Sequence, residues 1–393
     1  MTITAQTSIA ARAALQLRDG GAATVNELAV TLGLSRTSVE NAVAALGEAG
    51  VIVEAPAVFA RGAGRPARRY AFDADAGAVV GVDIGAASVR VAIADLAGRV
   101  LAHQTFPGVS EERDGASKLA AVIADLRRAL SEADLPFSRV RAIGVALPGI
   151  VDDSGRVTAS VVIPDWSGID IGSHLRQAFG CQVAVDNGVR LAAVAEHHLG
   201  VAQLVDDVLY LSVGNRIAMG LILGGEPRRG IHNAAGDIGR LAFRGLDTET
   251  GQISWRDGRT AADVFRLARA GDAAAVAEID AFVTELAHGI ATLVLTVDPA
   301  MIVIGGGLSA AHGQLLDPLR ERLQRFIGLP FQVPIAEARL GGEAAAHGAL
   351  VHAFSRHSTS VYGIEGLPIP SVTPLAPDGS TVRIDPLLLE ETM

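Results

Sequence analysis

Cysteine is almost absent from this sequence of 393 residues, which contains only Cys181. A single cysteine excludes an intramolecular disulfide and a cysteine-rich zinc cluster, and it is typical of a reducing compartment. Aromatic residues make up only 4% of the chain, although 49% of it is hydrophobic. The core is therefore expected to consist mainly of Ala, Val, Leu and Ile, and global disorder is excluded.

Long apolar runs are also missing. Stretches such as Leu119–Ala124 are far shorter than the ~20 residues that span a membrane. The N-terminus has no basic region followed by an apolar core, so it predicts no secretory signal. We therefore expect a cytoplasmic protein without membrane contact.

Net positive charge is confined to the N-terminal region. The chain has a net charge of −10, but residues 1–70 contain seven Arg and five acidic residues. The overall charge argues against a chain that binds nucleic acid along its whole length. The asymmetry leaves the N-terminal region as the candidate for DNA contact.

Residues 1–75 have the pattern of a winged helix-turn-helix. Thr24-Val25-Asn26-Glu27 has the form of a capping box, and Ser35 follows a glycine turn as the cap of the next helix. The predicted elements are helices at 9–17, after Thr24 and at 36–49, followed by strands at 51–54 and 68–72.

The last helix of this unit is the candidate recognition helix, which would place its N-terminal residues in the major groove of double-stranded DNA. Arg61 and Arg65 of the wing loop are expected at phosphates or in the minor groove. A three-helix dimerisation module with solvated polar residues is the alternative. The candidate base-reading residues are Ser35, Arg36, Thr37, Ser38, Glu40 and Asn41.

From Val79 onward, strands alternate with helices, which is typical of an α/β protein. Two strands run into glycine: 79–85 and 301–304. Glycine after a buried strand lets the backbone approach a phosphate or an adenosine. The other predicted elements are strands at 89–95, 100–104, 142–146 and 208–213, helices at 117–131 and about 275–296, and a Gly-rich segment at 214–225.

Four motifs resemble those of the ROK family (repressors, open reading frames and kinases), and their order and spacing along the chain agree with it. The resemblance extends from about residue 8 to residue 354. Gly81–Gly85 resembles the first phosphate motif, 230–240 (GIHNAAGDIGR) the sugar-and-zinc signature, and 302–309 the adenosine motif. Gly64-Arg65-Pro66-Ala67 resembles the linker of the repressor branch.

The resemblance implies a two-lobed, actin-like ATPase (ribonuclease H-like) α/β sugar-kinase fold, here preceded by a winged helix-turn-helix, and a homodimer or tetramer. We divide the chain into a DNA-binding domain (1–75), a first lobe (76–190), a second lobe (191–354) whose C-terminal helix returns to the first, and an extension (355–393). In the extension, residues 381–384 could form a strand, and the segment packs on a sheet edge or stays mobile.

The sequence departs from the family's kinases at the catalytic positions. Family kinases use the aspartate of a Glu-Asn-Asp-Ala-Asn stretch as the base, and Gly188 occupies that position here. A shifted register would make Asp186 the base, but it would rotate the small-residue face of the following helix away from its partner. Arg216 replaces a glycine of the second phosphate loop, and Ala86-Ala87-Ser88 stands where Gly-Thr-Lys-like residues are usual.

The family's zinc and sugar ligands have changed too. Arg240 replaces the zinc-binding histidine and no cysteine motif follows, so we expect no metal and no cofactor. Asn187, Asp237 and Arg240 remain as candidate contacts for a sugar or sugar derivative. Asp237 and Arg240 form either a structural ion pair or, through Arg240, a site for an anionic ligand; we favour the pair.

The sequence therefore predicts a DNA-binding transcriptional regulator that acts as a repressor and has a catalytically inactive kinase-like body. Two alternatives remain: an active sugar kinase with a DNA-binding appendage, and an oligomeric scaffold whose helix-turn-helix contacts only protein.

Overall fold

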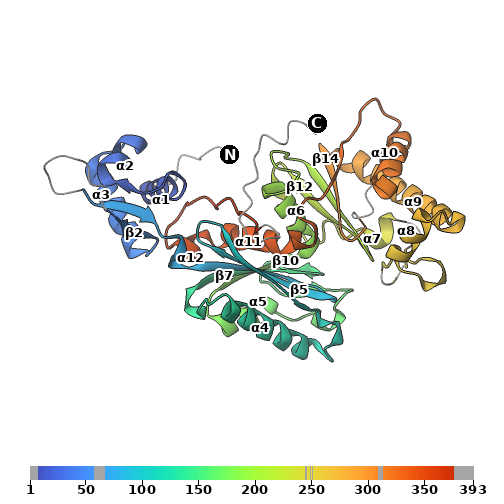
Figure 1. Ribbon diagram of the computed structural model, residues 1–393, viewed down its shortest axis with the longest axis horizontal. Coiled ribbons are helices and arrows are strands. Elements are labelled where there is room, and N and C mark those ends of the chain that lie inside the picture. Colours follow the sequence, from blue (N-terminus) through green and yellow to red (C-terminus); the bar gives the residue numbers. More distant parts are fainter. Residues whose placement is uncertain are drawn as a thin grey trace.

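The computed structural model describes residues 8–56, 67–243, 246–247, 249, 251–308 and 313–375, with the backbone alone at Arg240. A small N-terminal unit lies at one end of the molecule, and two larger lobes follow, each built on a five-stranded sheet (Figure 1). The α/β two-lobed fold with a preceding winged helix-turn-helix is the one that the sequence predicts.

The N-terminal unit packs three helices on a small antiparallel sheet of order β1-β3-β2. Its core contains fully buried Leu17, Leu28 and Leu46. The first helix extends beyond the predicted end at residue 17 and stops where Gly21 takes a φ of +83°. The elements are α1 (Ile9–Gly20), β1 (Ala23–Thr24), α2 (Val25–Leu32), α3 (Arg36–Glu48), β2 (Ile52–Ala55) and β3 (Arg69–Phe72).

The first lobe contains the sheet β10-β7-β4-β5-β6, in which β4 is parallel to β7 and antiparallel to β5. Alternation along β4 directs Val80 and Val82 into one core with α4 and α5, and Val79 into another on the opposite face. Its elements are β4 (Ala78–Ile84), β5 (Ser88–Asp95), β6 (Val100–Pro107), α4 (Gly115–Glu132), β7 (Val140–Leu147), β8 (Ile150–Val151), β9 (Val157–Ala159), α5 (Ile171–Phe179) and β10 (Gln182–Asn187).

The second lobe contains the sheet β13-β12-β11-β14-β15. Most of the Gly-rich segment 214–225 forms a strand, β12, which pairs with β11. Gly220 lets this strand lie close to α6, since an added Cβ would be 2.7 Å from Val189 O. The elements are α6 (Gly188–His198), β11 (Val208–Val213), β12 (Ile217–Leu223), β13 (Glu226–Pro227), α7 (Gly239–Ala242), α8 (Ala261–Arg269), α9 (Ala273–Val297), β14 (Met301–Gly305), α10 (Gly313–Ile327) and β15 (Ile335–Glu337).

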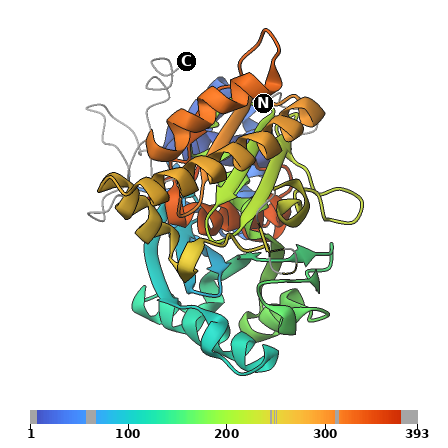
Figure 2. The same cartoon turned by 90° about the vertical axis from the view of Figure 1, so that its right-hand side faces the viewer.

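The outer side of each lobe carries its own helices. Figure 2 shows α9 and α10, in orange, at the far end of the molecule from α4, in teal. By length and composition, α9 is the one helix among the described residues that could cross a membrane, but half of that stretch is buried inside the lobe. It packs against α8 and α10, so it has the environment of a core helix.

Two C-terminal helices, α11 (Ala344–Arg356) and α12 (Ser358–Tyr362), connect the parts. α11 packs against α6 and lies across β4 and β7 of the first sheet. Glycines make this contact close: a Cβ on Gly81 would be 2.3 Å from Ala346 O, and one on Gly144 would be 1.8 Å from Ala349 O. Figure 1 shows α11 and α12 leading from the lobes toward the N-terminal unit.

Candidate functional site

The α2–turn–α3 segment is fixed by its caps. Thr24 and Glu27 form a reciprocal capping box, with Glu27 N to Thr24 Oγ1 at 3.2 Å and Thr24 N to Glu27 Oε2 at 2.7 Å. Gly33 ends α2 in the left-handed conformation, with a φ of +66°. Ser35 Oγ then accepts the N–H of Ser38 at 3.1 Å and starts α3. These local bonds set the angle between the two helices.

The N-terminal half of α3 presents polar side chains to solvent. Val39, Ala42, Val43 and Leu46 are buried on the inner face. Arg36 Nε donates to Glu40 Oε1 at 2.9 Å, and the Arg36 side chain remains 67% exposed. This bond leaves the two terminal guanidinium nitrogens without a partner among the described residues. Of the predicted DNA-contacting residues on α3, Ser38 is half-buried, and those exposed are Ser35, Arg36, Thr37, Glu40 and Asn41.

The wing forms the second part of this face. β2 and β3 pair in register, with Glu54 opposite Tyr70. Arg61 and Arg65, the predicted wing contacts, lie outside the described residues. Arg68, at the base of the wing, is 65% exposed and lies 3.8 Å from Glu54. Sequence reasoning did not single out Arg68, although the adjacent Arg68-Arg69 pair could have suggested it.

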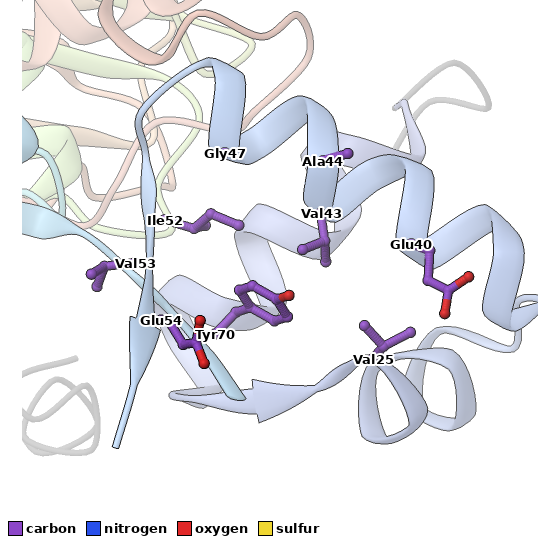
Figure 3. Close-up of a pocket in the computed structure, with 9 residues that line it drawn as sticks. All are labelled: Val25, Glu40, Val43, Ala44, Gly47, Ile52, Val53, Glu54 and Tyr70. Carbon is purple, nitrogen blue, oxygen red and sulfur yellow. The ribbon is translucent and has the colours of Figure 1, made fainter. Parts of the chain in front are cut away.

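A groove of about 350 Å³ separates α3 from the wing strands (Figure 3). The side chains of Val43 and Tyr70 face one another across it, while Glu40 and Glu54 stand at its rim. Two carboxylates at the rim disfavour a phosphate in the groove itself.

The candidate site in the body lies where β4 meets the first turn of α6. A Cβ on Gly188 would be 3.8 Å from Asp83 Oδ1 and 3.7 Å from the backbone of Leu147. Burial raises the pKa of Asp83 to about 6, with Arg90 lowering it and Glu343 raising it. Arg90 Nη1 lies 3.8 Å from Asp83, and Arg90 Nε lies 3.6 Å from Glu343.

Asp186 is enclosed in a network of ion pairs. Its side chain is only 2% exposed, and it pairs with Arg190 and, at 3.3 Å, with Arg229. Arg229 also pairs with Asp153 at 2.9 Å, so it joins the segment after β13 to two places in the first lobe. Arg190 donates to Asn233 O at 3.0 Å. Burial lowers the pKa of Arg190, and Asp186 opposes that shift.

The predicted effector contacts have different environments. Asn187 caps α6: its Oδ1 accepts from Val189 N at 2.9 Å, and its Nδ2 donates to Gly149 O at 2.9 Å. Asp237 is exposed, and no hydrogen bond or ion pair joins it to Asn187 within the described part of the chain. The Asp237–Arg240 pair lies outside what the structure describes, because the Arg240 side chain is not included.

The glycine motifs meet at the ends of β11 and β14. Gly306 has a φ of +84°, and a Cβ there would be 2.6 Å from Val213 O. The second phosphate loop is a tight hairpin tip in which Gly214 N donates to Arg216 O at 3.0 Å. Arg216 is partly covered and bridges to Gln252. Within the described residues there is no group of three or more His, Cys, Asp or Glu side chains placed to hold a metal ion.

A model of the "ROK family" matches residues 79–245 and 241–355. A glucokinase from Halalkalibacterium halodurans is 28% identical over 68% of this chain and 92% of its own length. A xylose repressor from Caldicellulosiruptor bescii is 24% identical over 82% of this chain and 89% of its own length. The crystal structure of a ROK family transcriptional regulator, a homolog of the E. coli MLC protein, superposes with a TM-score of 0.69 and 22% identity over 90% of this chain and 96% of its own. The chain therefore belongs to the ROK family.

Proposed function

We propose that this protein is a sequence-specific DNA-binding transcriptional regulator, acting as a repressor, whose kinase-like body does not phosphorylate sugars. The observation that carries the proposal is α3: its N-terminal half is polar and largely exposed, the two terminal guanidinium nitrogens of Arg36 have no partner among the described residues, and a wing lies beside the helix. The repressor and regulator matches cover 82% and 90% of this chain, and the glucokinase match covers 68%. Similarity to the regulators thus extends over more of the chain than similarity to that kinase.

Four features of the body argue against phosphoryl transfer. Gly188 has no side chain to accept a proton from a sugar hydroxyl. Asp186, the alternative base, is buried between Arg190 and Arg229. Arg90 pairs with Asp83, the aspartate of the first phosphate motif, and Arg216 stands in the second phosphate loop. A base needs a titratable group within reach of substrate, and this arrangement supplies none at Gly188.

The body then serves as an effector and oligomerisation module. Asn187, Asp237 and Arg240 are the proposed contacts for a sugar or sugar derivative. The division into a DNA-binding domain (1–75), two lobes (76–190 and 191–354) and an extension (355–393) is part of the same proposal. So are the homodimeric or tetrameric state and the cytoplasmic location.

The first experiment measures binding to DNA taken from beside the protein's own gene. Fluorescence anisotropy at several salt concentrations compares this DNA with a scrambled sequence of equal length. We expect the adjacent DNA to bind about 10³-fold or more tightly than the scrambled DNA. Arg65→Ala should weaken both DNAs similarly and lower the salt slope by about one unit. Equal affinity for both DNAs would contradict sequence-specific regulation.

The second candidate function is a sugar kinase, which the glucokinase match favours. A coupled assay with ATP and glucose, mannose or xylose tests it directly. We expect no turnover above background, because Gly188 cannot act as a base. Turnover above background in the parent protein would overturn this part of the proposal, and its loss in an Asp186→Asn variant that remains folded would identify Asp186 as the base.

A further inference from the structure

The N-terminal unit and the body share one hydrophobic core. The cluster that contains Leu17 and Leu46 of the N-terminal unit also contains Leu96 of the first lobe and Phe354 of α11. Tyr362, in α12, belongs to the same cluster and is fully buried. Units joined only by a linker have separate cores and move independently. The continuity here shows that the N-terminal unit is docked on the body.

Tyr362 is the central side chain of this junction. Its hydroxyl donates to Leu96 O at 3.0 Å, in the first lobe. Its ring lies 6.2 Å from that of Phe72, at the end of the wing strand β3. It also stacks on Phe354 of α11, with centroids 6.3 Å apart. One buried ring therefore contacts the wing, the first sheet and the C-terminal helix.

The residues after Tyr362 extend the contact across the N-terminal unit. A Cβ on Gly363 would be 3.0 Å from Ala49 Cβ, just after α3. Arg18 of α1, whose side chain is 5% exposed, donates to Pro368 O at 2.8 Å, and Ser8 Oγ donates to Glu365 O at 3.3 Å. The segment therefore contacts α1 and the C-terminal end of α3.

The same segment returns to the first lobe a few residues later. Thr373 N donates to Gly98 O at 2.9 Å, and Val100 N donates to Thr373 O at 3.1 Å. Residues 358–373 thus touch the N-terminal unit in the middle and the body at both ends. This stretch lies beyond the residues that the family model matches.

The other end of α11 lies at the candidate site in the body. Glu343, just before α11, lies 3.6 Å from Arg90 and 3.3 Å from His103, beside Asp83. Between the two ends, the backbone of α11 lies close to Gly81 and Gly144, where an added Cβ would be 2.3 Å from Ala346 O and 1.8 Å from Ala349 O. Backbone packed on backbone leaves little room for local adjustment. A displacement of α11 is therefore expected to move the helix as a unit.

We propose that residues 358–373, anchored by Tyr362 on Phe354 of α11, form a clasp that fixes the DNA-binding unit on the body. The clasp itself is independent of any ligand, whereas its effect on operator binding rests on the proposed function. Since a recognition helix must meet its groove in one orientation, a clasped unit presents α3 already aligned.

The clasp is tested by the rotational freedom of the DNA-binding unit in the full-length chain. A fluorophore is attached at Val30→Cys, which is 84% exposed, in a Cys181→Ser background. Time-resolved anisotropy should show only the tumbling of the whole particle, apart from motion of the dye. Tyr362→Ala should add a faster component from the released unit, and Tyr362→Phe, which keeps the ring contacts, should not.

The anisotropy measurement tests whether the clasp exists independently of any DNA binding. A fast component already present in the parent protein, or none in a folded Tyr362→Ala variant, overturns it. Circular dichroism verifies the folding of the variant. If Tyr362→Ala does not fold, Arg18→Ala in combination with Ser8→Ala serves instead, since it removes the two hydrogen bonds to Pro368 and Glu365 and should release the unit in the same way.

Operator affinity then tests the consequence of the clasp for DNA binding. We expect release of the unit to lower affinity for a confirmed operator by about tenfold, because only a fraction of orientations is competent. Affinity for scrambled DNA should change less. An unchanged operator affinity in a variant with a mobile unit would show that the clasp does not contribute to operator binding. Absence of any specific DNA binding by the parent protein would instead overturn the proposed function and leave the anisotropy result standing.

Discussion

The first turns of α3 and α6 are built alike and differ in what their polar groups do. Each helix has a polar cap, Ser35 for α3 and Asn187 for α6, and each has an arginine and a carboxylate nearby. On α3 the pair Arg36–Glu40 is exposed at 67% and 48%. At α6 the pair Arg190–Asp186 is exposed at only 3% and 2%.

Burial decides which of these groups remain available to a partner molecule. A buried charge must be paired, and its hydrogen bonds are used inside the protein. The exposed arginine on α3 has one bond to Glu40 and keeps its remaining donors for an external acceptor. The same residue types therefore point to recognition on α3 and to structural support at α6.

The largest expected effect is at the buried pair. Asp186→Ala leaves Arg190 as an unpaired buried cation and should lower the free energy of unfolding by about 3–5 kcal/mol. Adding Arg190→Met removes that charge and should recover most of the loss. Urea denaturation of the single and double variants measures both values. A single variant as stable as the parent would show that the ion pair is not buried in solution.

The buried side chain of His347 should make the stability of the protein depend on pH. It is 2% exposed, and burial lowers its pKa from 6.5 to about 4. Between about pH 6.5 and 4, His347 is protonated in the unfolded chain but neutral in the folded chain. The free energy of unfolding therefore decreases as the pH falls through this range. For this residue the loss is about 3 kcal/mol.

Unfolding free energies of the parent and of His347→Gln at several pH values test this difference. In this range, the free energy of unfolding of the variant should depend less steeply on pH, by the contribution of about one proton. His232→Gln, at an exposed position, is the control and should keep the parent slope. An identical slope in all three proteins would contradict the buried, neutral state of His347.

The two helix caps should differ less. Asn187→Ala removes two accepted N–H bonds and the bond to Gly149 O, in partly buried surroundings. We expect a loss of about 2 kcal/mol there and about 1 kcal/mol for Ser35→Ala, whose cap is exposed. Thermal unfolding of both variants gives the comparison. A larger loss of stability for Ser35→Ala than for Asn187→Ala would contradict the inference that the cap of α6 contributes more than the cap of α3.

Local sequence patterns predicted much of this structure. The capping box at Thr24 and the cap at Ser35 define the helix-turn-helix because each involves residues only three apart. The network around Asp186 left no such signal, because Arg229 and Asp153 are brought to it by the pairing of distant segments. Strand β12 was not predicted because Gly220, whose missing side chain allows close packing on α6, lies in a Gly-rich stretch that resembles a loop.

The C-terminal segment illustrates the same limit. Packing on a sheet edge and mobility were equally compatible with its prolines. Thr373 does pair with the edge strand at Val100, but the contacts with Arg18 and Ala49 depend on where the N-terminal unit docks. The strand expected at 381–384 lies outside the described residues.

Operator binding by Arg36→Ala, compared with the matched control Arg325→Ala, tests most directly whether α3 is the recognition helix. Both arginines are exposed helical residues paired with a glutamate four positions away, at 67% and 68% exposure. Titration of a confirmed operator and its single-base variants should show that Arg36→Ala costs about 1–3 kcal/mol, selectively at one base pair, while Arg325→Ala changes nothing. Equal operator affinity for both variants and the parent would show that α3 is not the recognition helix.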